Sequence, residues 1–151
     1  MDSIIVRQAG LSDLDMLVPL FDAYRQFYGR KHDVGAARAF LLARFHHAES
    51  TIFIALEGAS AVGFTQLYPS FSSVSLARIF ILNDLYVDAH ARRKGVASKL
   101  MSAAVEFARS QGAVRVSLST ATTNVTAQAL YQSAGWKRDE QFLVYHLTLT
   151  T

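Results

Sequence analysis

The chain has 151 residues, of which 51% are apolar and 18% charged, and its formal net charge is +3. A chain of this length buries about 70% of its unfolded surface, so we expect one domain over residues 1–151. The absence of cysteine excludes disulfides and thiolate metal sites and is expected of a reducing, cytoplasmic compartment. We expect neither a signal peptide nor a membrane span, and the charge is too small to indicate nucleic-acid binding.

The first part of the chain predicts one strand and two helices. A short apolar strand covers 4–6. Apolar and aromatic residues then recur at helical spacing over 11–28, with Pro19 inside the pattern, where it should bend the helix or lie near its start. Asp33 is a suitable N-cap for a second helix over 34–47.

The middle of the chain predicts three strands. Residues 51–56 and 61–68 are apolar runs separated by a Glu-Gly-Ala-Ser turn, which indicates a hairpin. A loop over 69–73 contains proline and serine. The long apolar run 74–87 predicts the central strand.

The last part alternates helices and strands. An amphipathic helix begins near residue 96 and is closed by Gly112, and a strand follows over 114–118. A helix over 124–134 and a final strand over 141–150 complete the chain. This order of elements predicts an α/β protein with a mixed central β-sheet flanked by helices.

A cationic loop connects the central strand to the helix after it. Arg92, Arg93, Lys94 and Gly95 lie together in this loop. The first N–H groups of a helix have no partner inside it, and the helix dipole adds positive charge there. Gly95 lets the backbone approach a ligand, and Ala97 keeps the following turn small. The pattern predicts a site for a pyrophosphate.

Two motifs carry a resemblance to a known family. Arg-x-x-Gly-x-Ala at 92–97 resembles the acyl-CoA loop of the GNAT superfamily of N-acetyltransferases. Asn-x-x-Ala-x-x-Leu-Tyr-x-x-x-Gly-Trp at 124–136 is similar to a second family motif, with Trp136 in place of phenylalanine. The nucleoside-triphosphate and dinucleotide glycine motifs are absent from the sequence. The resemblance implies a GNAT-type fold and acetyl-CoA as co-substrate.

The resemblance also implies how the donor is held. The strand leading into the loop would diverge from its neighbour and bind the pantetheine arm, and the N–H of Val87 or Tyr86 would polarise the thioester carbonyl. The cofactor-binding residues expected are Leu85, Tyr86, Val87, Arg92, Arg93, Lys94, Gly95, Val96, Ala97 and Asn124.

Two residues are expected to be catalytic. Tyr131 matches the position of the family's general acid in the second motif. Its phenol can protonate a departing thiolate. Asn124 caps the helix that carries Tyr131, binds pantetheine, or does both. The base is open. Diamine acetyltransferases of the family have glutamate where this chain has Asn83, and the adjacent Asp84 matches their aspartate. Asp84 could act through a water, bind a cationic substrate, or be a structural carboxylate. Water alone could take the proton, or the amine could arrive neutral.

The function expected is transfer of the acetyl group to a primary amine, small or polyamine-like, by direct attack in a ternary complex. The alternatives are an acetyltransferase for protein N-termini or lysines and a non-catalytic acyl-CoA-binding or nucleic-acid-binding module. The five histidines are dispersed, so we expect no metal. We expect no membrane or nucleic-acid partner, and whether the chain forms a homodimer is left open.

Overall fold

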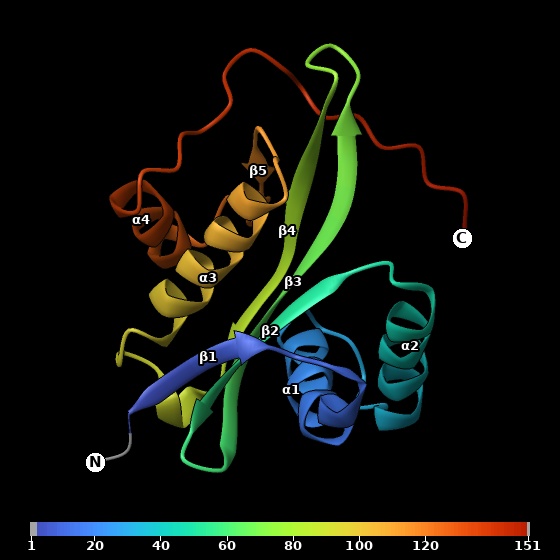
Figure 1. Ribbon diagram of the computed structural model, residues 1–151, viewed down its shortest axis with the longest axis vertical. Coiled ribbons are helices and arrows are strands. Elements are labelled where there is room, and N and C mark those ends of the chain that lie inside the picture. The colour runs from blue at the N-terminus through green and yellow to red at the C-terminus, as the bar shows by residue number, and fades with distance from the viewer. Residues whose placement is uncertain (1–2, 151) are drawn as a thin grey trace. The chain divides into compact units, whose positions relative to one another are not determined.

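The computed structural model describes residues 3–150, in two compact units that divide after Ser119. The elements of the first unit run from β1 to β5, and the second unit holds α4 (Figure 1). Their bounds are β1 Ile4–Gln8, η1 Leu11–Asp13, α1 Leu14–Phe27, α2 Val34–His47, β2 Thr51–Glu57, β3 Ser60–Ser72, β4 Ala77–Val87, η2 Ala89–Ala91, α3 Val96–Ser110, β5 Val116–Ser117 and α4 Val125–Ser133.

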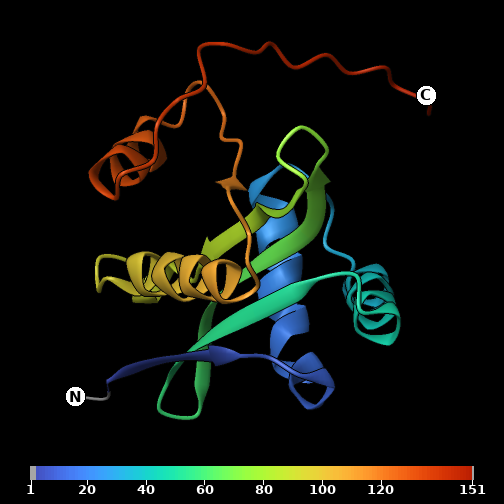
Figure 2. The ribbon, with the colours of Figure 1, turned by 45° about the horizontal axis from the view of Figure 1, so that its top comes forward.

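The first unit is built on a sheet with the strand order β1-β2-β3-β4-β5. Neighbouring strands are antiparallel from β1 to β4, and β5 is parallel to β4. Helices α1 and α2 lie on one side of the sheet and α3 on the other (Figures 1 and 2). This arrangement confirms the predicted mixed sheet flanked by helices. Whether the whole chain is one domain stays a prediction.

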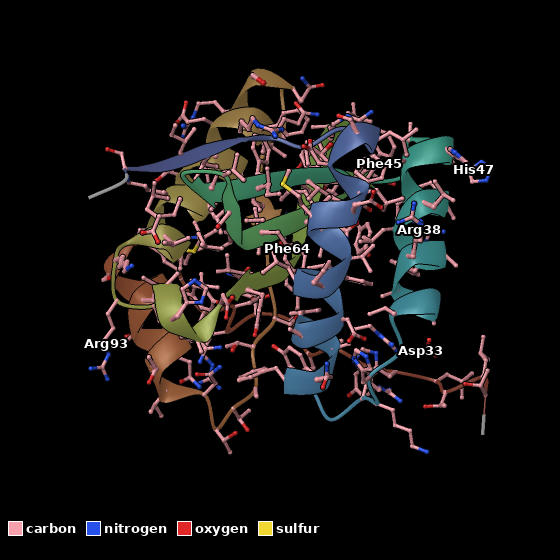
Figure 3. The ribbon with its side chains drawn as sticks, turned by 90° about the horizontal axis from the view of Figure 1, so that it is seen from below. Asp33, Arg38, Phe45, His47, Phe64 and Arg93 are labelled. Carbon is pink, nitrogen blue, oxygen red and sulfur yellow. The ribbon has the colours of Figure 1, made fainter. Side chains whose placement is uncertain are left out.

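The face of the sheet under α1 holds the larger part of the core. Phe64 of β3 packs beside α1, as Figure 3 shows, and its exposed fraction is 1%. A bidentate ion pair joins β1 to the start of α1, with the two terminal guanidinium nitrogens of Arg7 each 2.8 Å from a carboxylate oxygen of Asp13. The Arg7 guanidinium lowers the pKa of Asp13 to about 2. The apolar residues buried here include Leu14, Leu17, Val18, Phe21, Ala37, Leu41, Ile52 and Ile54.

Close packing at Gly63 fixes α3 against the other face. A Cβ atom at this position would lie 2.9 Å from the Tyr86 carbonyl oxygen and 3.3 Å from side-chain atoms of Val96 and Leu100. Any larger residue would push the helix outward. Gly63 therefore holds the first turns of α3 beside the end of β4.

The hairpin between β3 and β4 is longer than the sequence predicted. The residues expected as a loop over 69–73 mostly continue β3, and β4 begins at Ala77 instead of residue 74. Pro69 is tolerated because β2 ends opposite Leu67, so the missing N–H faces an unpaired edge.

The final strand predicted over 141–150 is wrong. Residues 134–150 contain neither helix nor strand. Alternating apolar residues supply β propensity, but a strand forms only where its N–H and C=O groups pair with a neighbour, and none of the described strands pairs with this segment. For the same reason the strand expected over 114–118 shortens to Val116–Ser117, the residues that pair with β4.

Candidate active site

One edge of β4 is open over its second half. Phe80 and Ile81 pair with β5, but the described part of the chain pairs no strand with this edge beyond them. The parallel strands β4 and β5 thus diverge after Ile81, as the resemblance implied. The backbone of residues 82–87 can therefore bind a ligand along that edge.

The ladder with β3 decides which backbone groups face the opening. The N–H of Asp88 donates to the carbonyl of Val62 at 2.8 Å, and Tyr86 is registered opposite Phe64. Backbone groups alternate sides along a strand, so the Tyr86 N–H also points toward β3. The N–H groups of Leu85 and Val87 point to the open edge. Of the two donors expected for a thioester carbonyl, the geometry therefore favours Val87.

A β-bulge at Asn83 sets the direction of the next side chains. Gln66 is registered opposite Asp84 and Leu67 opposite Leu82, which leaves Asn83 as the extra residue. Asp84 is consequently turned to the α1 face of the sheet, on the same side as Gln66. The resemblance to diamine acetyltransferases matches Asp84 to their aspartate and leaves its role open.

The carboxyl group of Asp84 is buried and held by amides. Its exposed fraction is 2%. Oδ1 accepts a hydrogen bond from Nδ2 of Asn83 at 2.7 Å, and Oδ2 accepts one from Nε2 of Gln66 at 2.6 Å. Ser50 Oγ donates to Oε1 of Gln66 at 2.7 Å. Burial raises the pKa of Asp84, and the donors, including the Tyr24 hydroxyl, oppose that shift. All these partners donate, which suits an ionised carboxylate.

Tyrosines from two elements surround this carboxyl. The Tyr24 hydroxyl donates to the carbonyl oxygen of Asn83 at 3.2 Å, and its ring meets the Tyr86 ring at 6.4 Å. Burial raises the pKa of Tyr24, and the negative charge of Asp84 adds to the effect. Burial, with the same charge, raises the pKa of Tyr68 to about 12. Both phenols are therefore protonated at neutral pH.

The loop before α3 has the backbone geometry of an anion site. Arg93 and Gly95 have positive φ angles of 65° and 77°. Gly95 is the N-cap residue of α3, and no side chain caps this helix. Within residues 3–150, the backbone N–H groups of 93–98 donate to no other group. An uncapped helix of this length presents unpaired donors and the positive dipole end, which fits a pyrophosphate.

The three cations of the loop have different surroundings. Nε of Arg92 donates to the Val87 carbonyl at 3.0 Å, and Nζ of Lys94 lies 3.2 Å from a carboxylate oxygen of Glu57. The Arg93 side chain extends outward from the loop (Figure 3) and has no ion pair with the described residues. Arg93 is therefore the cation of the three that a ligand can engage without breaking an existing contact.

A cleft of about 330 Å³ opens on the α1 face near the end of β4. Pro19 and Leu20 of α1 form one wall, and Ser60 at the start of β3 forms another. Tyr86 of β4 and Asp88, which follows β4 and is the N-cap residue of η2, close it. Its size is at the lower end of the range for small-molecule sites, about 300–1,000 Å³.

Asn124 and Tyr131 belong to the second unit. Oδ1 of Asn124 accepts a hydrogen bond from the N–H of Ala127 at 3.1 Å, so Asn124 caps α4. The Tyr131 ring lies on the same helix, with its centroid 6.2 Å from that of Trp136. Their roles in binding and catalysis stay predictions.

Sequence reasoning missed Gln66 and the contact of Tyr24 with Asn83. A signal for Gln66 was available, because it shares an inward-facing side of its strand with Val62, Phe64 and Tyr68 and is the one polar amide there. No signal in the sequence pairs Tyr24 with Asn83, since 59 positions separate them.

Among the described residues no helix is long and apolar enough to cross a membrane. On this mixed α/β sheet, an open strand edge leads into an uncapped helix N-terminus. The unpaired N–H groups of both could bind an extended ligand that ends in an anion.

Comparison with known proteins identifies the family. The model of the Acetyltransferase (GNAT) family matches residues 17–136. An uncharacterized N-acetyltransferase, YhfO of Bacillus subtilis, is 47% identical over 95% of this chain and 97% of its own length. The crystal structure of a probable acetyltransferase, 45% identical, superposes with a TM-score of 0.93 over 97% of this chain and 99% of that one. Aminoglycoside N(6')-acetyltransferase type 1 of Serratia marcescens is 29% identical over 80% of this chain and 84% of its own length.

The chain belongs to the GNAT family of acetyltransferases. Enzymes of this family take the acetyl group from acetyl-CoA, and this chain is an enzyme of that class. The sequence-based prediction of the family and of acetyltransferase activity is confirmed.

Proposed function

We propose that this chain transfers the acetyl group of acetyl-CoA to a small primary amine by direct attack in a ternary complex. The observation that supports this most is the continuity of the open edge of β4 with the uncapped N-terminus of α3. The β4 edge offers neutral N–H donors for the extended pantetheine arm, and the α3 N-terminus offers positive charge for the phosphates.

The residues present fit the cofactor. The backbone N–H groups from Arg93 to Ala97 would hold the pyrophosphate, and the Arg93 side chain would add charge. The N–H groups of Leu85 and Val87 would bind the pantetheine arm. When bound, acetyl-CoA supplies an activated acetyl thioester.

Two residues of the second motif complete the donor side of the proposal. Tyr131 donates its phenolic proton to the leaving sulfur, which avoids release of a free thiolate. Asn124 uses its Oδ1 to cap α4. Its Nδ2 remains to donate to the pantetheine arm, so both roles expected for Asn124 are compatible.

The acceptor side is proposed to be the α1 face of β4. The buried carboxylate of Asp84 attracts an ammonium group and accepts its proton, leaving the neutral amine that attacks. The cleft of about 330 Å³ on the same face, lined by Tyr86 and Asp88 but not by Asp84, is of a size for a small acceptor. The similarity to an aminoglycoside acetyltransferase supports a small polyamine as well.

Thiol release tests this function directly. The full chain is incubated with acetyl-CoA and, separately, with butylamine, spermidine, kanamycin and a lysine-containing peptide. We expect amine-dependent thiol release with at least one of the small amines. Release with the peptide alone would assign a protein acceptor. Thermal stabilisation by acetyl-CoA with no amine-dependent release would assign a non-catalytic binding module.

A further inference from the structure

The cleft on the α1 face has apolar walls and a single charge. Four apolar residues line it from one stripe of α1, at the three- and four-residue spacing of a helix face: Met16, Pro19, Leu20 and Ala23. Leu20 also belongs to the buried core, so the cleft opens onto the edge of that core. Among residues 3–150, Asp88 is the one charged residue that lines the cleft. This lining suits a ligand with an aliphatic part and a positive charge.

Small residues at the β2–β3 turn leave the cleft its space. Ala59 lies in the turn, and Ser60 and Ala61 begin β3. A larger side chain at Ala59 would occupy part of the cleft. In the described part of the chain the Ser60 hydroxyl has no hydrogen-bond partner, so it can accept a bond from a ligand. The cleft therefore offers a hydroxyl and a carboxylate to the same ligand.

The carboxylate of Asp88 is available to that ligand. Its side chain is 40% exposed, and Oδ2 lies 3.1 Å from Nδ1 of His90. Asp88 is the N-cap residue of η2, but its side chain caps no N–H group there. With the residues that the structure describes, Oδ1 makes neither a hydrogen bond nor an ion pair. One oxygen of this carboxylate is thus free to accept a hydrogen bond from an ammonium group.

The contacts already made by Asp88 do not account for a carboxylate at this position. His90 is 62% exposed, and a pair between two such exposed side chains contributes little to stability. The position of the backbone is fixed without the side chain, because the Asp88 N–H donates to the Val62 carbonyl at 2.8 Å. Arg92 stays outside the cleft lining, with its Cζ 5.7 Å from the centroid of the Tyr86 ring. Asp88 is therefore left to act on a cation that enters the cleft.

The cleft adjoins the N–H group proposed to bind the thioester. Asp88 follows Val87 directly, and consecutive Cα atoms are about 3.8 Å apart. The Val87 N–H points to the open edge of β4, whereas Tyr86 and Asp88 line the cleft on the α1 face. A group in the cleft and an acetyl group at that edge would lie on two sides of the same β4 residues. A short aliphatic chain can connect two such positions.

We propose that the cleft binds a second, non-reacting ammonium group of the acceptor and that Asp88 is the residue that selects it. The ammonium has three N–H donors, of which one bonds to Oδ1 of Asp88 and one to the Ser60 hydroxyl. The aliphatic chain packs on the apolar stripe of α1, and another amine of the same molecule attacks the thioester. This inference rests on the proposed function and narrows the acceptor to an aliphatic di- or polyamine.

A binding experiment without acetyl-CoA tests the cleft. The ¹⁵N-labelled full chain is titrated with butylamine and with butan-1-ol, which differ only in the charged head group. Butylamine should give saturable shifts of the amide signals of Ala59, Ala61 and Asp88, and butan-1-ol should bind about tenfold more weakly. Asp88→Asn should weaken butylamine binding by about tenfold. Asp15→Asn, which removes an exposed carboxylate of α1 outside the cleft lining, is the matched control and should bind as the wild type does.

A second variant tests the space instead of the charge. Ala59→Leu fills part of the cleft from an exposed turn and keeps Asp88, so it should fold with a Tm near that of the wild type. We expect it to lose the saturable shifts at Ala61 and Asp88. Wild-type binding in Ala59→Leu would mean that amines only meet a surface carboxylate, and it would overturn the proposal. Equal binding of butylamine and butan-1-ol, or no loss of binding in Asp88→Asn, would overturn it as well.

Kinetics test the role of this ammonium in the reaction. With whichever of spermidine or kanamycin gives the faster thiol release, Asp88→Asn should lower kcat/KM by about tenfold, mainly through KM. For butylamine, which has no second amine, kcat/KM should stay within about twofold. Equal losses for both acceptors, no loss for either, or turnover of butylamine but of neither polyamine would overturn the inference and leave the proposed function standing. Absence of thiol release with every amine refutes the proposed function instead, and the titration still decides whether the cleft binds an ammonium group.

Discussion

Gln66 and Asp84 lie opposite each other on neighbouring strands, and Nε2 of Gln66 donates a 2.6 Å hydrogen bond to Oδ2 of Asp84. Gln66 is fully buried, and its other amide atom accepts from Ser50. Burying an amide costs free energy unless its oxygen and its nitrogen are both hydrogen bonded. The bond to the Asp84 carboxylate therefore explains why a glutamine is tolerated at this buried position.

Replacing Gln66 by methionine should destabilise the protein in a pH-dependent way. The variant loses a donor to a charged group, worth about 1.5–3 kcal/mol. Burial already raises the pKa of folded Asp84, so the folded state is favoured when this group is protonated, and that advantage is lost as pH rises through its folded pKa. The deficit should therefore be larger at neutral pH than in acid, measured by urea unfolding. Ser50→Ala keeps the donor and should show little pH dependence; equal deficits for Gln66→Met at both pH values would contradict the role of Gln66.

Gly95→Glu should abolish stabilisation by acetyl-CoA. The new carboxylate would repel the phosphates, and a φ of +77° strains any L-residue at this position. At 100 times its Kd, acetyl-CoA should stabilise the wild-type protein by about 2.7 kcal/mol, seen as a thermal shift. Gly112→Glu introduces the same residue at a φ of +75° beyond the other end of α3. This control should lower Tm and still respond to acetyl-CoA. A response retained in Gly95→Glu would show that the phosphates bind elsewhere.

Tyr131→Phe tests the general acid. The variant keeps the ring that packs near Trp136 and removes the hydroxyl. If Tyr131 protonates the leaving sulfur, kcat should fall by about 10²–10⁴-fold while KM for acetyl-CoA changes little. Tyr145→Phe, the other tyrosine of residues 120–150, is the matched control. A change in kcat below about threefold, measured where chemistry limits the rate, would refute the assignment.

Asp13→Asn should weaken the fold at neutral pH but not in strong acid. The pKa of Asp13 is lowered to about 2 by Arg7, so the pair stabilises the protein above the ordinary aspartate range and is lost as pH falls toward 2. We expect a loss of about 1.5–3 kcal/mol at pH 7. Asp15→Asn removes an exposed ion pair with Arg38 and should cost less than about 1 kcal/mol. Denaturant unfolding at pH 7 and pH 2 measures both, and a deficit for Asp13→Asn that persists at pH 2 would argue against the ion pair.

Local patterns predicted the elements whose causes are local. Asp33 accepts the N–H of Ala36 and caps α2, as its residue type indicated. The helix expected over 11–28 forms as η1 and α1, with Pro19 inside α1. The errors occur where a partner strand decides the outcome. Pro69 continues β3 because β2 has already ended, and residues 141–150 form no strand because none of the described strands pairs with them.

The sequence by itself determined the family, the mixed α/β fold and the loop that would hold a pyrophosphate, because short motifs and hydrophobic periodicity carry these features. Only the tertiary structure decided which N–H groups of β4 are unpaired, since that depends on the register with β3 and on how soon β5 diverges. The tertiary structure also brought Tyr24 and Gln66 to Asp84 from α1 and β3. Contacts between residues so far apart in the chain arise from the packing of α1 on the sheet, and no local pattern encodes them.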